Sequence, residues 1–241
     1  MSPDVRHRLI DAFPLHQVDE FDPDEDFLAD LEPGATVVVA GGDGTTGFVA
    51  RRLVGSGHPL GILPLGTFNS FARSLNLPRD VDQAIEVIKH GRAQPVTVGR
   101  LGDLPFLEAA SAGLAGRVVE AGEALKDLHF GELGRELGQL LSSRRFEFRL
   151  SGDLELSGFA FSLTFANTPS IGALIPLADT TPQEPSLSFV QSEGGVPFRR
   201  ARLETEPPIQ VYADNMPAGC TPIEISADSR ALQVILPRSD S

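Results

Sequence analysis

The stretch "TVVVAGGDGTTGFVARRL", residues Thr36–Leu53, joins an apolar run, a glycine-rich turn around one aspartate, and a segment with helical character. The apolar run has no polar alternation, which is typical of a strand buried on both faces of a sheet. Thr45 or Thr46 can cap the segment that follows the turn. The stretch therefore predicts a strand, a tight turn and a helix.

The next segments along the chain extend this pattern. "HPLGILPLG", residues 58–66, predicts a second strand, and "VDQAIEVIKHG", residues 81–91, predicts a helix with one apolar face that ends at Gly91. Strands that alternate with helices are typical of a mainly parallel sheet covered by helices. We therefore predict a mainly parallel α/β domain over residues 1–96, the nucleotide-binding domain if the glycine turn binds a nucleotide.

Beyond residue 96 the pattern changes to short alternating strands. "RRFEFRLSGDLELSGFAFSLTF", residues 144–165, predicts an antiparallel hairpin, in which Phe159, Phe161 and Phe165 are expected on one inner face. One helical insertion is predicted over residues 122–141. Residues 97–241 are thus predicted to form an antiparallel β-sandwich domain, and the cleft between the two domains is the expected place for a site.

Composition limits the classes of function. Acidic residues outnumber basic residues by 33 to 20, and the formal net charge of −13 argues against a general electrostatic grip on nucleic acid. The single cysteine excludes an internal disulfide, and the first residues lack the pattern of a signal peptide, so we expect a cytoplasmic protein. No uncharged apolar stretch approaches the roughly 18 residues needed to span a bilayer, so any membrane contact is expected to be peripheral. The sequence leaves the oligomeric state open.

The glycine turn favours phosphate binding, because a turn between a strand and a helix aims backbone N–H groups at an anion and glycine lets the backbone approach it. Gly42, Gly44 and Gly47 also fit the G-x-G-x-x-G pattern of dinucleotide sites. The region about 20 residues further on lacks the carboxylate that this pattern requires. A purely structural turn is a further alternative, which a second glycine turn in "LPLGTFNSFARSLNLP", residues 63–78, disfavours.

Together, "GGDGT" at residues 41–45 and "LPLGT" at residues 63–67 resemble the catalytic domain of diacylglycerol kinases, sphingosine kinases and bacterial lipid kinases. The resemblance continues through "PFLEAASAGLAGRVVE", "FANTPSIGALIPLADTT" and the C-terminal segment that begins with "VYADNMPAG". It covers roughly residues 36–237, which is most of the chain.

The resemblance implies transfer of a phosphoryl group from ATP, with Mg²⁺, to the hydroxyl of a diacylglycerol-like or sphingoid lipid. It implies that Asp43 organises the metal and the transfer, and that Asp214 is the general base. The residues implied to bind the nucleotide come from both glycine turns: Gly41, Gly42, Gly44, Thr45, Gly66, Thr67 and Asn69.

The sequence departs from the family pattern at several positions. The expected Asn-Pro-x-Ser-Gly turn is not found near the start of the chain, and Ser70, Thr97 and Met216 stand at positions that are usually acidic. These departures leave two alternatives to a lipid kinase. One is a regulatory module that binds a nucleotide or a lipid without catalysis, and the other is an enzyme that resembles NAD kinase, since NAD kinases share the first motif.

Overall fold

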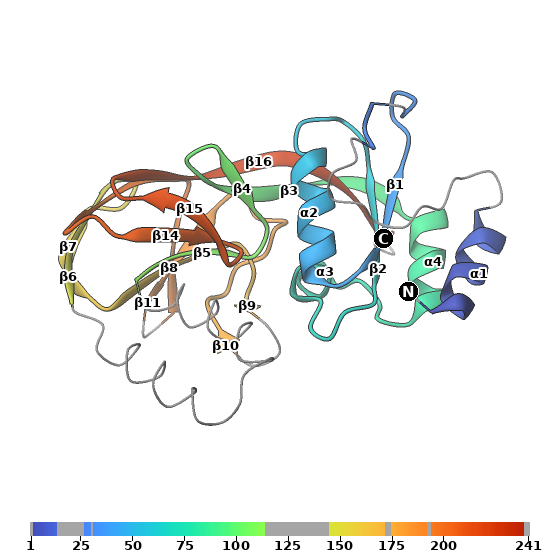
Figure 1. The fold of residues 1–241 in the computed structure, drawn as a ribbon, viewed down its shortest axis with the longest axis horizontal. Coiled ribbons are helices and arrows are strands. Elements are labelled where there is room, and N and C mark those ends of the chain that lie inside the picture. Colours follow the sequence, from blue (N-terminus) through green and yellow to red (C-terminus); the bar gives the residue numbers. More distant parts are fainter. Residues whose placement is uncertain are drawn as a thin grey trace.

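The computed structural model describes residues 2–13, 27–29, 31–113, 145–171, 175–191 and 194–238. In it, two lobes are joined by two long strands, β3 (Arg92–Leu101) and β16 (Ile223–Leu236) (Figure 1). The helix predicted over residues 122–141 lies outside the described residues.

The N-terminal lobe is built on parallel strands. β1 (Val37–Gly41) and β2 (Leu60–Pro64) pair in parallel, and α2 (Asp43–Leu53) connects them. α2 packs on one face of this sheet, and α4 (Val81–His90) packs on the other. Every residue of β2 is buried. In β1, the strand expected to be buried on both faces, apolar side chains contact the cores on both sides, but Val39 alone is fully buried.

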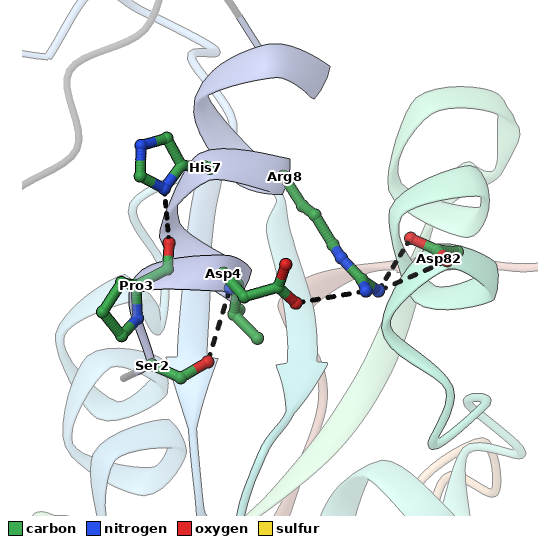
Figure 2. A network of polar contacts seen from close by, with 7 residues as sticks. Ser2, Pro3, Asp4, His7, Arg8 and Asp82 are labelled. Atoms are coloured by element: carbon green, nitrogen blue, oxygen red, sulfur yellow. Dashed lines mark hydrogen bonds and ion pairs between the residues drawn. The ribbon is translucent and has the colours of Figure 1, made fainter.

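Helix α1 (Pro3–Ala12) lies against α4 at the edge of this lobe (Figure 1). The hydroxyl of Ser2 accepts a hydrogen bond from the backbone N–H of Val5 and caps the helix. The guanidinium of Arg8 reaches Asp4 on its own helix and Asp82 on α4 (Figure 2). These carboxylates are exposed, so the ion pairs orient α1 and add little to stability.

The long antiparallel strands β3 and β16 run through both lobes. β16 also pairs in parallel with β2 through Val234 and Leu60, and Leu232, Val234 and Leu236 are buried in the N-terminal core. The end of the chain therefore completes the sheet of the lobe in which the chain begins.

The C-terminal lobe is a sandwich of two sheets. The first sheet continues from β16 through β13 and β6 to β7, and the second has the order β12-β11-β8-β5-β14-β15 with antiparallel pairing throughout. Their facing side chains form one apolar core, in which Phe165 contacts Phe189 and Phe198. This confirms the predicted α/β domain followed by an antiparallel β-sandwich. The remaining elements are α3 (Ser70–Ser74), β4 (Leu104–Phe106), β5 (Ala109–Gly113), β6 (Phe146–Gly152), β7 (Leu156–Ala160), β8 (Ser162–Ala166), β9 (Ser170–Ile171), β10 (Ile175–Pro176), β11 (Leu187–Gln191), β12 (Gly194–Phe198), β13 (Arg200–Glu206), β14 (Gln210–Ala213) and β15 (Met216–Cys220).

The expectation that Phe159, Phe161 and Phe165 share an inner face is wrong. Phe165 is buried, but the exposed fractions of Phe159 and Phe161 are 63% and 51%. The chain leaves the first sheet after β7 and enters the second sheet at β8, with a bend at Phe161 between them. Alternation along the sequence does not continue across this change of sheet.

The two glycine turns of the N-terminal lobe pack directly against each other. A Cβ atom on Gly66 would lie 2.4 Å from the Cα atom of Gly42 and 2.8 Å from Oδ1 of Asn69. The backbone N–H of Leu65 donates to the carbonyl of Gly41 at 2.9 Å and joins the turns. Any side chain at position 66 would force the turns apart.

We therefore expect Gly66→Ala to lower the free energy of unfolding by about 2 kcal/mol or more, because overpacking a rigid contact costs roughly 1–3 kcal/mol. Urea unfolding measures this change. Gly44→Ala is the matched control, because a Cβ atom there would meet nothing within 4 Å. Equal stability of the Gly66 variant and the wild type would contradict the tight contact.

Candidate active site

The first glycine turn opens helix α2 without a side-chain cap. Gly42 is the N-cap residue, and within the described part of the chain no side-chain hydrogen bond caps the helix. The first hydrogen bond of the helical ladder runs from the backbone N–H of Thr46 to the carbonyl of Gly42. The N–H groups that precede Thr46 have no partner within the helix, and they carry the positive end of its dipole. This terminus can accept phosphate oxygens.

The residues predicted to bind the nucleotide surround this terminus. Gly44 is exposed at the first turn, and Thr45 lies against Gly41. On the second turn, Thr67 and Phe68 are exposed at the tip, and Arg79 donates to the carbonyl of Thr67 at 3.0 Å. The structure thus brings the two turns to one place, with their tips open to solvent.

Asn69 holds the second turn together from inside. Its side-chain amide donates to the carbonyls of Pro64 and Gly66, and its Oδ1 accepts the backbone N–H of Gly66 at 2.9 Å. Asn69 has a left-handed backbone and is only 2% exposed. Its side chain therefore shapes the loop that would meet the nucleotide.

Asp43 is the first residue of α2, and its carboxylate reaches the second turn. The backbone N–H groups of Asn69, Ser70 and Phe71, at the start of α3, donate to this carboxylate. Burial raises the pKa of Asp43, while these N–H groups and the charge of Arg73 act in the opposite direction. Asp43 thus joins the two turns next to the open end of α2.

Asp214 belongs to the C-terminal lobe, at the turn between β14 and β15. Asp214 and Asn215 both have positive φ values, as in a two-residue type I′ hairpin turn. The Asp214 carboxylate accepts the backbone N–H groups of Leu107, Glu108 and Ala109 at 2.7, 2.8 and 3.2 Å.

The Asp214 side chain also contacts the N-terminal lobe, through Arg51. Its Oδ2 lies 3.5 Å from Nη2 of Arg51 on α2, and both side chains are largely buried. Burial raises the pKa of Asp214, although Arg51 and the three N–H groups favour the ionised form. The side chain therefore points into the molecule, toward the lobe that carries Asp43.

Sequence reasoning did not identify Glu108, a third acidic residue whose pKa responds to the charges of both Asp43 and Asp214. Burial, together with the negative charges of Asp214 and Asp43, raises its pKa from 4.5 to about 8. Ser70 donates a side-chain hydrogen bond to the Glu108 carboxylate, and Arg51 acts in the same direction as this bond. The sequence feature that could have identified Glu108 is a single charged residue within the otherwise mostly apolar segment "PFLEAAS".

The three positions that depart from the family pattern differ in what they do. The Ser70 hydroxyl contacts Glu108. Thr97 is buried, and its hydroxyl donates to the carbonyl of Glu184. Met216 is 37% exposed at the start of β15. Within the described residues, Ser70 is thus the one of the three with a hydrogen bond to the carboxylate cluster of Asp43, Glu108 and Asp214.

Asn167 supports the cluster from behind. It is fully buried, and its side-chain amide donates to the carbonyls of Thr97 and Leu107 at 3.0 and 2.8 Å. Its backbone N–H donates to the carbonyl of Glu108 at 2.8 Å. These bonds fix the strand segment from which Glu108 extends.

Among the residues that the structure describes, no group of three or more His, Cys, Asp or Glu side chains could hold a metal ion. A metal beside Asp43 would therefore take most of its ligands from elsewhere. Mg²⁺ fits this arrangement, since it commonly binds through one or two carboxylates, substrate phosphates and water. In the same part of the chain, no helix is long and apolar enough to cross a membrane.

Known proteins are similar to this chain both in sequence and in fold. Residues 5–101 match the family of the diacylglycerol kinase catalytic domain. A diacylglycerol kinase of Mycobacterium tuberculosis is 28% identical over 97% of this chain and 87% of its own length. The chain is therefore similar to diacylglycerol kinases, and the match to the family of their catalytic domain covers residues 5–101.

Solved structures agree on the fold. A diacylglycerol kinase from Bacillus anthracis has a TM-score of 0.71, with 22% identity and coverage of 97% of this chain and 89% of that one. Yeast NADH kinase has a TM-score of 0.51, with 12% identity over 84% of this chain and 62% of that one. The likeness to NADH kinase extends to the fold and no further.

The carboxylate cluster predicts a pH-dependent stability. Because the pKa of Glu108 is higher in the folded protein than its ordinary value of 4.5, the folded state binds the extra proton. The stabilisation is complete below about pH 4.5 and is lost as the pH rises through about 8. We expect the free energy of unfolding to fall between pH 5 and pH 8, with a contribution from Glu108 on the order of 2 kcal/mol.

Urea unfolding at several pH values measures this slope. Glu108→Gln should flatten it, whereas Glu224→Gln, at an exposed position of β16, should keep the wild-type slope. An unchanged slope in the Glu108 variant would show that its carboxyl group does not titrate in this range.

Proposed function

We propose that the protein transfers the γ-phosphoryl group of ATP to the hydroxyl of a lipid, with a diacylglycerol-like acceptor as the first candidate. The observation that carries the proposal is the contact of two glycine turns at the N-terminus of α2, where Asp43 lies and where the charges of Asp43 and Asp214 act on Glu108. Phosphoryl transfer needs positioned phosphates and neutralised charge more than covalent chemistry from the protein. This arrangement suits those needs.

In this proposal the N-terminal lobe binds the nucleotide and the C-terminal lobe binds the acceptor. Backbone N–H groups at Gly44 and Thr45 and the backbone near Gly66 and Thr67 bind and orient the phosphates. Mg²⁺, which Asp43 would hold, supplies charge neutralisation at the transferring group. The C-terminal lobe presents the acceptor hydroxyl, and Asp214 ties this lobe to α2 through Arg51. A lipid acceptor would place the protein at a membrane surface as a peripheral, cytoplasmic enzyme.

Purified protein with Mg²⁺ and radiolabelled ATP should phosphorylate diacylglycerol or a sphingoid base presented in mixed micelles. Asp43→Asn should reduce the rate at least about 100-fold, in the range expected for the loss of a group acting directly on the reaction. Asp103→Asn, at an exposed position in the turn before β4, is the control that should keep full activity. Thermal unfolding of both variants checks that each remains folded.

The same assay separates the alternatives. Phosphorylation of NAD in place of every lipid would identify an enzyme that resembles NAD kinase. Saturable binding of nucleotide or lipid without any product would identify a regulatory module. Activity of Asp43→Asn equal to that of the wild type would refute the role proposed for Asp43.

A further inference from the structure

The transfer proposed above, on which this inference rests, requires a group that takes the proton of the acceptor hydroxyl. Two carboxylates near the junction of the lobes compete for this role. Asp214 is the residue expected from the family pattern, and Glu108 is the residue that the structure adds. Their surroundings differ in how much acceptor capacity each has left.

Donors within the protein occupy all the hydrogen-bond acceptor sites of the Asp214 carboxylate. A carboxylate offers about four acceptor sites. The N–H groups of Glu108 and Ala109 donate to Oδ1, and the N–H of Leu107 and the guanidinium of Arg51 lie at Oδ2. Proton transfer to Asp214 would break one of these contacts in a largely buried place, which is unfavourable.

Glu108 is held in place mainly by its backbone. Its N–H donates to Asp214, and its carbonyl accepts the backbone N–H groups of Asn167 and Thr168 at 2.8 and 3.2 Å. Among the described residues, Ser70 supplies a side-chain hydrogen bond to the carboxylate. The backbone is thus fixed at both ends of the residue, while the side chain keeps acceptor capacity.

The charges around Glu108 favour a proton acceptor that works near neutral pH. Burial raises its pKa most, followed by the charges of Asp214 in the β14–β15 turn and Asp43 on α2; Ser70 from α3 and Arg51 from α2 act in the opposite direction, and the pKa is about 8. A general base is most effective when its pKa lies near the working pH. Arg73, also on α3, acts on the neighbouring Asp43.

We infer that Glu108 accepts the proton of the lipid hydroxyl, and that Asp214, paired with Arg51, is the positioning residue that holds the Glu108 segment against α2. In the reaction, the hydroxyl oxygen forms a bond to the γ-phosphorus as its proton passes to the Glu108 carboxylate. The bond between the γ-phosphorus and the bridging oxygen breaks, and ADP leaves with the electron pair. Glu108 then releases the proton to solvent.

The test compares Glu108→Gln, Glu108→Asp and Asp214→Asn in the full chain, with the lipid that the wild type phosphorylates. Glu108→Gln should lower kcat at least about 100-fold with little change in the KM for ATP, and Glu108→Asp should recover part of the loss. The rate of the wild type should rise with pH toward a plateau above about pH 8, and this limb should vanish in Glu108→Gln.

Ser70→Ala provides a readout that a merely structural role of Glu108 would not produce. Because the Ser70 hydroxyl lowers the pKa of Glu108, its removal should move the ascending limb of the pH profile to higher pH. Glu108→Gln removes a charge that is unfavourable in a buried place and should unfold no more easily than the wild type at pH 8; urea unfolding at this pH checks that the variant is folded.

The outcomes are distinct. A wild type that phosphorylates no lipid refutes the proposed function itself. A wild type that is active, with Glu108→Gln equally active or with an ascending limb that disappears only in Asp214→Asn, refutes the assignment of Glu108 and leaves the proposed function standing.

Discussion

The carboxylate of Asp214 is the interaction on which the arrangement of the site depends. It lies at a two-residue turn of the C-terminal lobe, yet it accepts three consecutive N–H groups from residues 107–109 and pairs with Arg51 of α2. One side chain therefore fixes the segment that carries Glu108 and ties that segment to the helix that begins at Asp43. Because the group is largely buried, its loss would leave both Arg51 and the N–H groups without their partner in a place poorly reached by water.

A second constraint acts within the N-terminal lobe, where the backbones of two glycine turns meet. Gly42 and Gly66 approach so closely that position 66 has no room for a side chain, and the side-chain amide of Asn69 hydrogen-bonds within its own loop. The open end of α2 and the exposed tip at Thr67 follow from this contact. The phosphate-binding geometry is thus a property of the backbone, while the proton chemistry depends on side chains that the other lobe holds in place.

The sequence predicts what is encoded locally. An unbroken apolar run before "GGDGT" was sufficient to predict a strand, although its residues other than Val39 are half-buried, and alternation in residues 144–165 was sufficient to predict a hairpin. The orientation of Phe159 and Phe161 could not be predicted, because the chain changes sheets between β7 and β8 and the alternation loses its meaning there. Glu108 also has no local pattern. Its character depends on Asp43 and Asp214, which are far from it in sequence and close enough in the fold to raise its pKa. The roles assigned to Asp43, Asp214 and the nucleotide-binding residues remain predictions, although the fold brings these residues to one junction.

The cluster of Asp43, Glu108 and Asp214 points to a functional site, because its like charges oppose folding. Like charges in a buried place oppose folding, and a protein of formal net charge −13 gains nothing from adding more of them. A core selected for stability alone would place an amide or an apolar residue at position 108. The glutamate is instead held by its backbone, burial and the charges of two other carboxylates raise its pKa, and the proton that it binds neutralises its charge. A group that is costly when charged and that gains or loses its proton near neutral pH suits a step in which a proton must be taken up and then released. The same environment that makes Glu108 unfavourable for folding therefore makes it suitable for the chemistry proposed for this site.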